Sequence, residues 1–341
     1  MSALRSVRTG ARSLSYSFPI VAGVVVLCVA SSIFSSGFLA PSSWAPTLSG
    51  AAPIILLSMA QAVAVIGGRA GVDLSVGPLA GLVNAIVVVE LAGRGITDPF
   101  VVIPVCLAIG LASGALNGFL IAYLGVPAIV ATLGTYLAYL GLTLEILPTS
   151  GGAVPMWLAD LTGQVGPVPG MLVVILAVSL AWMLLISTAF RRNLYATGAD
   201  ERAAYTSGVD VPLTRFLAYC VAGAIASIGG LALTGLLQSG DPGVSSVFTL
   251  QSIAAVALGG VLLSGGRGGL LGAACGGAAL FLVQNLLSLA HVGLDGLQIA
   301  YGLILLLAIT ANSVAGWARR RRKAVAMVPT REEDALAPAT A

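Results

Sequence analysis

The sequence predicts an all-α polytopic membrane protein with about ten transmembrane helices and both termini in the cytoplasm. Hydrophobic residues make up 58% of the 341 residues and charged residues only 9%, whereas a soluble domain carries roughly a quarter charged residues. The mean hydropathy of +1.02 points the same way. The 43 glycines suit helices packed backbone to backbone in lipid, because small residues allow close approach.

Ten apolar stretches follow one another along the chain, and crossing the hydrocarbon core takes about 20 residues. Charges, prolines and glycine clusters limit them near 18–39, 49–67, 72–92, 100–124, 127–147, 169–189, 213–237, 249–264, 269–290 and 297–316. The third begins with AGVDLSVGPLAG, which suggests a broken or partly re-entrant span, and the eighth is short. Whether these two cross the membrane fully is therefore left open.

The distribution of basic residues supports this topology, because Lys and Arg accumulate on the cytoplasmic side. Ten spans with both termini inside place fifteen of the sixteen basic residues in the cytoplasm and leave only Arg94 outside. The transmembrane domain then covers 18–316. Residues 1–17 form a basic cytoplasmic segment, and an uncleaved first helix is favoured over a signal peptide because the apolar run is long and no clean cleavage site follows.

The C-terminal residues 317–341 form a tail that begins with five consecutive basic residues and becomes polar. Low aromatic content predicts disorder. The basic run is interpreted as a cytoplasmic stop signal near anionic membrane lipid, with no nucleic-acid partner.

One internal cytoplasmic loop, residues 190–212, is much longer than the others. Arg191–Arg215 holds seven of the chain's 29 charged side chains. Asp200 can cap a helix, two alanines favour it and Gly208 can end it, which predicts a short helix of about two turns. Such a helix is marginal in water. It is either a turn in a solvated loop or a segment that lies on the surface of a cytoplasmic motor.

The sequence argues against an enzyme. A Walker A loop needs Gly-Lys-Ser/Thr, and the only lysine is Lys323. The four cysteines and the single histidine lack metal-ligand spacing, and no constellation of Asp, His, Cys and Ser suggests catalysis. The chain is therefore expected to bind no cofactor or metal itself.

Polar side chains at membrane depth are costly and raise the question of function. The candidates are Gln61, Asn84, Asn117, Thr132, Thr135 and Asn285. They could line a weakly polar path for a hydroxylated solute, or make hydrogen bonds between helices, which is the favoured interpretation for each residue alone. Asp73 is expected to cap the start of the third span. Glycines at 110, 114 and 118 share one helix face and predict close packing within the chain.

Four blocks of sequence resemble one known family. ATGADERAAYTSGVDVPLTRFLAYCVAGAIASIGG resembles the cytoplasmic coupling segment of permeases in the ribose, xylose and galactose ABC importer family. GRAGVDLSVGPLAG (68–81), NGFLIAYLGVPAIVATLGTYLAYLGL (117–142) and AAVALGGVLLSGGRGGLLGAACGG (254–277) are similar to the same family in the expected order. The resemblance covers roughly residues 50–312.

The resemblance implies the transmembrane subunit of an ATP-binding-cassette (ABC) importer in the bacterial inner membrane, with a monosaccharide as the solute. It implies three partners: an ABC ATPase that uses ATP and magnesium, an extracytoplasmic solute-binding protein, and a second permease subunit in a homodimer or heterodimer. The implied ATPase-coupling residues are Gly198, Asp200, Glu201, Ala203, Ala204, Ser207 and Gly208. Asp200 and Glu201 would make polar contacts with the ATPase, and the alanines with Gly208 would allow close docking.

Two alternatives stay open. An ABC permease for branched-chain amino acids or nucleosides shares the expected architecture. An ion-coupled secondary transporter would need an intramembrane carboxylate, for which only Asp73 is plausible, and it would leave the polar loop without a task.

Overall fold

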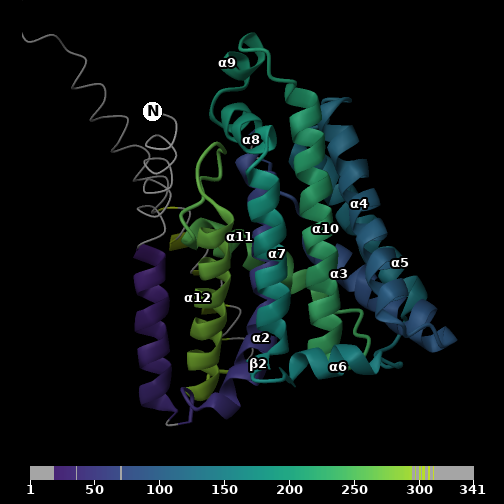
Figure 1. The fold of residues 1–341 in the computed structure, drawn as a ribbon, viewed down its shortest axis with the longest axis vertical. Helices are drawn as coiled ribbons and strands as arrows, with labels where there is room; N and C mark the ends of the chain where they lie inside the picture. Colours follow the sequence, from purple (N-terminus) through teal and green to yellow (C-terminus); the bar gives the residue numbers. More distant parts are fainter. Residues whose placement is uncertain are drawn as a thin grey trace, which may run out of the picture.

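The computed structural model describes residues 19–35, 37–69 and 71–293, together with 296, 299–300, 302–303, 306–307 and 310. This part of the chain is a bundle of helices with one small hairpin (Figure 1). An apolar helix, Pro19–Phe34, comes first. The labelled helices are α2 (Pro41–Ile66), α3 (Val76–Ala85), α4 (Pro99–Ala122), α5 (Ala128–Ile146), α6 (Met156–Thr162), α7 (Gly170–Ile186), α8 (Ala189–Ala199), α9 (Glu201–Thr206), α10 (Val211–Leu237), α11 (Ser245–Leu258) and α12 (Leu270–Leu289). A π-helical stretch (Ile86–Leu91) and a 3-10 turn (Ala92–Arg94) extend α3, and strands β1 (Gln164–Val165) and β2 (Val168–Pro169) pair antiparallel.

Six helices in the described residues are long and apolar enough to cross a membrane, and a seventh arises if α7 and α8 count as one span bent by 84°. Helix α11 and Pro19–Phe34 are apolar but shorter. The prediction of an all-α polytopic membrane protein is confirmed. The count of ten spans and the placement of both termini stay predictions, since 1–17, 317–341 and most of the tenth stretch lie outside the described residues.

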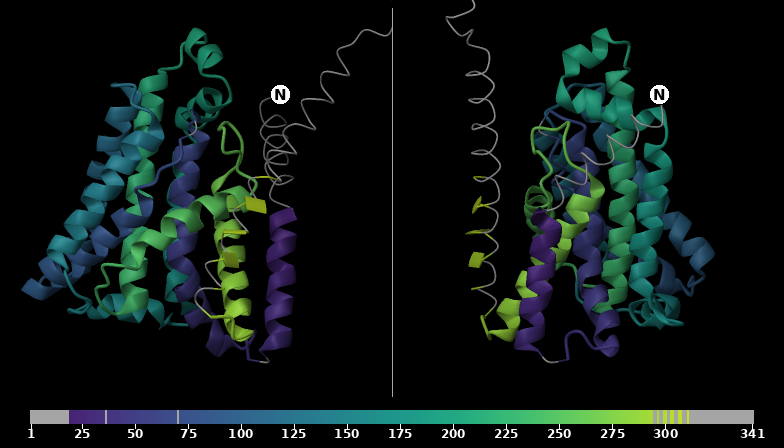
Figure 2. Two further views of the ribbon diagram at one scale, coloured as in Figure 1. Left: turned by 180° about the vertical axis from the view of Figure 1, so that it is seen from behind. Right: turned by 60° about the vertical axis from the view of Figure 1, so that its left-hand side comes forward.

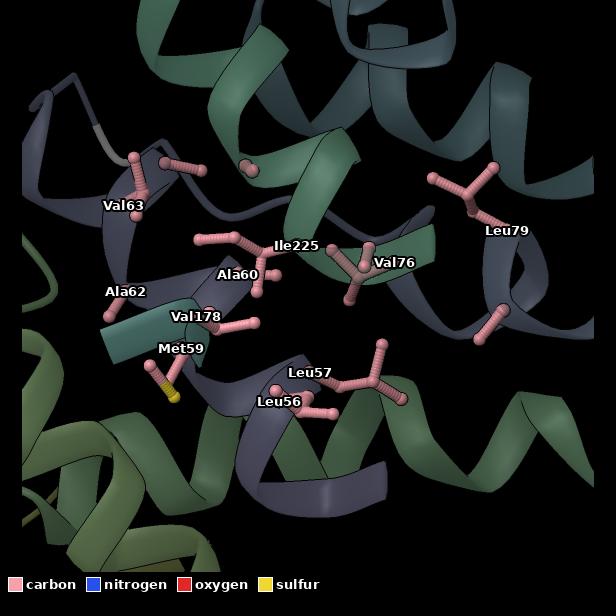
Figure 3. Close-up of a cluster of buried hydrophobic side chains, with 14 of the residues drawn as sticks. Leu56, Leu57, Met59, Ala60, Ala62, Val63, Val76, Leu79, Val178 and Ile225 are labelled. Atoms are coloured by element: carbon pink, nitrogen blue, oxygen red, sulfur yellow. The ribbon is translucent and has the colours of Figure 1, made fainter. Parts of the chain in front are cut away.

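Helix α2 forms the centre of the bundle. Its apolar window is 94% buried, against 28% for α4 and for α5. A helix that is apolar all round belongs in the middle of a bundle. Figure 3 shows the side chains of α2 meeting Val76 of α3, Val178 of α7 and Ile225 of α10. The pair α4 and α5 stands at the edge (Figure 1), and Pro19–Phe34 lies beside α12 on the other side (Figure 2).

Helices α4 and α10 touch through the glycine face predicted from the sequence. A Cβ on Gly110 would lie 2.4 Å from the carbonyl oxygen of Gly223, and one on Gly114 would lie 2.2 Å from that of Tyr219. No room therefore exists for a side chain between the two backbones. The expectation that this seam packs within the chain is confirmed.

Replacing Gly114 with alanine should destabilise the protein by about 1–3 kcal/mol, the usual cost of overpacking. The matched control is Gly134→Ala on α5, where an added Cβ meets nothing within 4 Å. The control should leave stability unchanged or raise it slightly, because alanine favours helix. Thermal unfolding in detergent measures both variants, and equal midpoints would contradict the seam.

Two breaks in the helical backbone lie inside the bundle. The first is the non-helical connection between α2 and α3, which covers 67–69 and 71–75 among the described residues. Because Val76–Arg94 is still long enough to cross a membrane as one span, a broken or partly re-entrant third span stays a prediction. The second is 238–244, between α10 and α11. Helix α2 ends beside α8, whereas α10 ends beside α6 at the opposite end of the molecule (Figure 1). Non-helical backbone is tolerated at membrane depth only where protein or a water-filled cavity surrounds it, and such breaks therefore need hydrogen-bond partners.

The two ends of the bundle carry short elements that the sequence predicted only in part. At the end where α9 lies, which we call the α9 end, the polar loop contains two helices where one was expected, because α8 continues through Gly198 to Ala199. At the α6 end, the connection between α5 and α7 contains α6 and the hairpin. These elements are too short for a hydrophobic period to reveal.

Candidate functional site

Helix α9 forms one tip of the molecule, beyond α8 and the start of α10 (Figure 1). Asp200 begins it, with an Oδ1 atom that accepts a hydrogen bond from the Ala203 backbone N–H at 3.0 Å, so the predicted cap is confirmed. Gly208 ends the turn with φ +83°, a conformation that favours glycine, and its N–H donates to Tyr205. Asp200 and Gly208 thus mark the two ends of α9, as predicted from the sequence.

The predicted coupling residues divide into an inner and an outer set. Ala204 is buried, while Ala203, Ser207 and Gly208 are exposed. Tyr205 stands out among the exposed residues, since 72% of its surface is accessible. The outer side of α9 therefore presents Arg202 and several small residues around one aromatic ring, and the sequence did not single out that ring.

Glu201 points inward and joins three parts of the chain. Its Oε2 lies 3.1 Å from Nε of Arg69, in the loop after α2, and 3.2 Å from Nη2 of Arg215, in α10. Oε1 accepts a longer hydrogen bond of 3.5 Å from Arg215 Nη1. The Arg215 side chain is only 4% exposed, and a buried guanidinium needs a counter-charge. We call Arg69, Glu201 and Arg215 the ion cluster.

Four glycines pack backbone to backbone beside the ion cluster, and we call Gly68, Gly198, Gly265 and Gly266 the glycine joint. A Cβ on Gly198 would lie 1.9 Å from the Ile66 carbonyl oxygen, and one on Gly265 would lie 2.4 Å from Cα of Gly68. The Gly266 N–H donates to the Ile66 oxygen at 3.0 Å. The ends of α2 and α8 and the loop between α11 and α12 therefore meet without intervening side chains.

A polar network surrounds the first break. The side-chain amide of Gln61 pairs with the backbone of Asp73 when its nitrogen faces the carbonyl oxygen and its oxygen faces the N–H. In that orientation it donates to the Asp73 carbonyl oxygen at 2.8 Å and accepts from the Asp73 N–H at 3.0 Å. The Asp73 carboxylate accepts from the backbone and hydroxyl of Ser75. Asn117 donates to the Ser75 hydroxyl at 2.9 Å and accepts from Thr135 at 2.9 Å. The break is thereby tied to α2, α4 and α5.

Two threonines add further bonds to this network. Thr132 donates to Ala128 at 2.8 Å and, over a longer 3.4 Å, to the carbonyl oxygen of Val72 within the break. Thr249 of α11 donates to the Leu74 carbonyl oxygen at 3.1 Å. The break before α3 therefore contacts α11 as well.

A second polar network holds the break after α10. Asn84 Nδ2 donates to the Thr234 hydroxyl and to the Ser239 carbonyl oxygen, each at 3.1 Å. Asn84 Oδ1 accepts from the Asp241 N–H at 3.0 Å. One amide side chain thus replaces hydrogen bonds that a continuous helix would supply.

The predicted path residues thus lie in two separate places. Gln61, Asn117, Thr132 and Thr135 gather at the first break, Asn84 lies at the second, and Asn285 is half-buried on α12 outside both networks. All but Asn285 are buried and hydrogen-bonded between helices or breaks. Their role in a solute path stays a prediction, and a solute would reach them only if the helices separated.

Comparisons with known proteins identify relatives over most of the chain. Residues 43–311 match the family described as "Branched-chain amino acid transport system / permease component". The ribose import permease protein of Haemophilus influenzae is 33% identical over 261 residues, which is 72% of this chain and 78% of that protein. The ribose import permease protein of Bacillus subtilis is 32% identical over 295 residues (84% and 89%). An autoinducer 2 import system permease protein of Escherichia coli is 32% identical over 289 residues (83% and 82%). No solved structure matches the chain.

Proposed function

We propose that this chain, which belongs to the family of branched-chain amino acid transport system permease components, is the transmembrane subunit of an ABC importer. The proposed solute is a small hydroxylated molecule, and a monosaccharide is the class that fits best. The chain is a multi-pass protein of the inner membrane. The family relation identifies a transport subunit, and its chemistry is movement of a solute without making or breaking bonds.

The substrate proposal rests on the names of the relatives. The family description mentions branched-chain amino acids, but the proteins that share 32–33% identity over more than two thirds of this chain are permeases for ribose and for autoinducer 2. A sugar-like solute suits the weakly polar amide and hydroxyl groups at the first break. A solute bound by such groups would be released readily, as a transporter requires.

The driving force in this proposal comes from a separate ATPase subunit that uses ATP and magnesium and docks on α9. The observation that carries this step is the exposed outer side of α9, with Tyr205 at 72% exposure, on a helix whose other side is held by the ion cluster. Aromatic side chains of this kind are common anchors in protein interfaces.

We also propose the remaining partners and the topology. An extracytoplasmic binding protein would deliver the solute at the α6 end, and a second permease subunit would complete the path. The apolar windows of α4 and α5 are only 28% buried, which leaves that edge open to lipid or to the second subunit. Ten spans with both termini in the cytoplasm, including a transmembrane domain over 18–316 and a coupling loop over 190–212, agree with the position of α8 and α9 at one end.

The test is uptake by proteoliposomes that contain the tagged chain purified from its native membrane with its co-purifying subunits. With ATP on the cytoplasmic side and binding protein outside, labelled ribose should accumulate, and a protonophore should not prevent it. Uptake that needs no ATP and collapses with the ion gradient would instead identify a secondary transporter and direct attention to Asp73. Uptake of leucine without ribose would contradict the substrate class alone.

A further inference from the structure

We propose that the ion cluster and the glycine joint fix α9 to the break before α3, so that Arg69 and Arg215 are positioning residues that pass a displacement of α9 into the membrane. This inference rests on the proposed function, because it assumes that an ATPase moves α9. It concerns how the movement travels from the tip of the molecule to the first break.

The ion cluster is the first attachment. Helix α9 has six residues, which is too few for stability by itself. Glu201 at its first position binds Arg69 at 3.1 Å and Arg215 at 3.2 Å, so the helix is anchored to the loop after α2 and to α10 at once. One carboxylate serves two guanidinium groups. Glu201 and Arg69 are 36% and 60% exposed, and ion pairs with this much exposure add little net stability, which makes a role in fixing geometry the better account of this arrangement.

The glycine joint is the second attachment. Gly198 lies one residue before the end of α8, and its backbone touches Ile66 and Gly266 so closely that no Cβ fits. Tyr195 of α8 adds a hydrogen bond of 2.8 Å to the Gly268 carbonyl oxygen. Close-packed backbones have no side chains that could absorb a shift. Movement of α8 and α9 must therefore displace the end of α2 and the loop before α12.

The first break, between α2 and α3, is the part of the bundle to which a displacement of α9 would pass. Arg69 lies in the same non-helical connection between α2 and α3, two residues before Gly71. That connection is bonded to Gln61 of α2, to Asn117 of α4 through Ser75, and to Thr249 of α11. A shift of Arg69 is thus connected along the chain, and from there through these hydrogen bonds, to helices on several sides of the bundle, the kind of physical link that coupling requires.

The experiment replaces the ion pair with a removable chemical link. Arg69→Cys and Glu201→Cys are combined in a background in which Cys28, Cys106, Cys220 and Cys275 are alanine, within the reconstituted complex. Arg69 Nε and Glu201 Oε2 meet at 3.1 Å through long side chains, whereas a cysteine carries its sulfur directly on Cβ, so a linker is used in place of a direct disulfide. A short bis-methanethiosulfonate can bridge them, and a reductant removes it.

The unlinked variant should lose ATP-driven uptake by on the order of tenfold, equivalent to about 1.4 kcal/mol, while its ATPase activity stays near that of the parent. Linking should raise uptake severalfold toward the parent level, since it restores the attachment of α9 to the loop after α2 but not the Glu201–Arg215 pair, and reduction should lower uptake again. The matched control is Glu90→Cys with Arg94→Cys, an ion pair near the α6 end whose loss should not change uptake.

Three outcomes decide the inference. A severalfold rise in uptake on linking supports it. Parent-level uptake in the unlinked variant overturns it, and so does uptake that stays low after linking while ATPase activity is intact, because position would then not be the missing property. Absence of ATP-driven uptake in the cysteine-free parent would count against the proposed function instead.

Discussion

Glu201→Gln should abolish most ATP-driven uptake and lower stability, because it leaves the buried Arg215 and the neighbouring Arg69 without a carboxylate. Breaking a fully buried ion pair costs about 3–5 kcal/mol. The cost here should be nearer 1–3 kcal/mol, since Glu201 is 36% exposed and Arg69 is 60% exposed, and solvent screens such charges. Thermal unfolding and uptake by the same proteoliposomes measure the two effects.

Arg69→Gln and Glu90→Gln separate coupling from stability. Arg69 is largely exposed, so its loss should change stability by less than about 1 kcal/mol, yet uptake should fall as in the Glu201 variant. Glu90 has the same 36% exposure and also pairs with an arginine, but near the α6 end. Its substitution should leave uptake unchanged. If Glu201→Gln and Glu90→Gln changed uptake to the same extent, the proposed coupling role of Glu201 would be refuted.

Tyr205→Ala should detach the ATPase while the permease stays folded. An exposed aromatic anchor contributes about 2 kcal/mol or more to an interface, which corresponds to roughly 30-fold weaker binding. Since 72% of the Tyr205 surface is accessible, folding should change by less than about 0.5 kcal/mol. Titration of the detergent-purified permease with the ATPase measures the affinity.

Met156→Ala is the matched control for the tyrosine variant. Met156 is 79% exposed but begins α6, at the opposite end of the molecule. Its loss should not affect ATPase binding. Binding that is insensitive to Tyr205 and equally insensitive to Met156 would place the docking surface elsewhere.

The sequence predicted those features that depend on local chemistry. The apolar runs marked α2, α4, α5, α7, α10 and α12 because lipid demands long apolar helices. The glycine and aspartate pattern before Val76 indicated the break, and Asp200 and Gly208 marked the ends of α9 because caps depend on neighbouring backbone groups. The glycines on one face of α4 likewise predicted a close helix contact, which α10 makes.

Features that depend on distant contacts were not predictable. Arg69 and Arg215 looked only like basic residues of the cytoplasmic side, and nothing local reveals that both reach Glu201. The weak helix propensity of Gly198 predicts an interruption, but its contacts with Ile66 and Gly266 outweigh that propensity, and α8 continues past it. Polarity alone marks the six path candidates in the sequence, and only the fold separates the group at the first break from Asn84 and Asn285.

Photocrosslinking from α9 in the native membrane tests the central claim most directly. A benzophenone amino acid in place of Tyr205 should label an ABC ATPase subunit, and the same probe in place of Met156 should not. Labelling that depends on the Tyr205 position would establish the docking of a separate motor on α9. If the Tyr205 probe labelled only lipid or this chain while the complex imported its solute, the account of coupling through α9 would be contradicted.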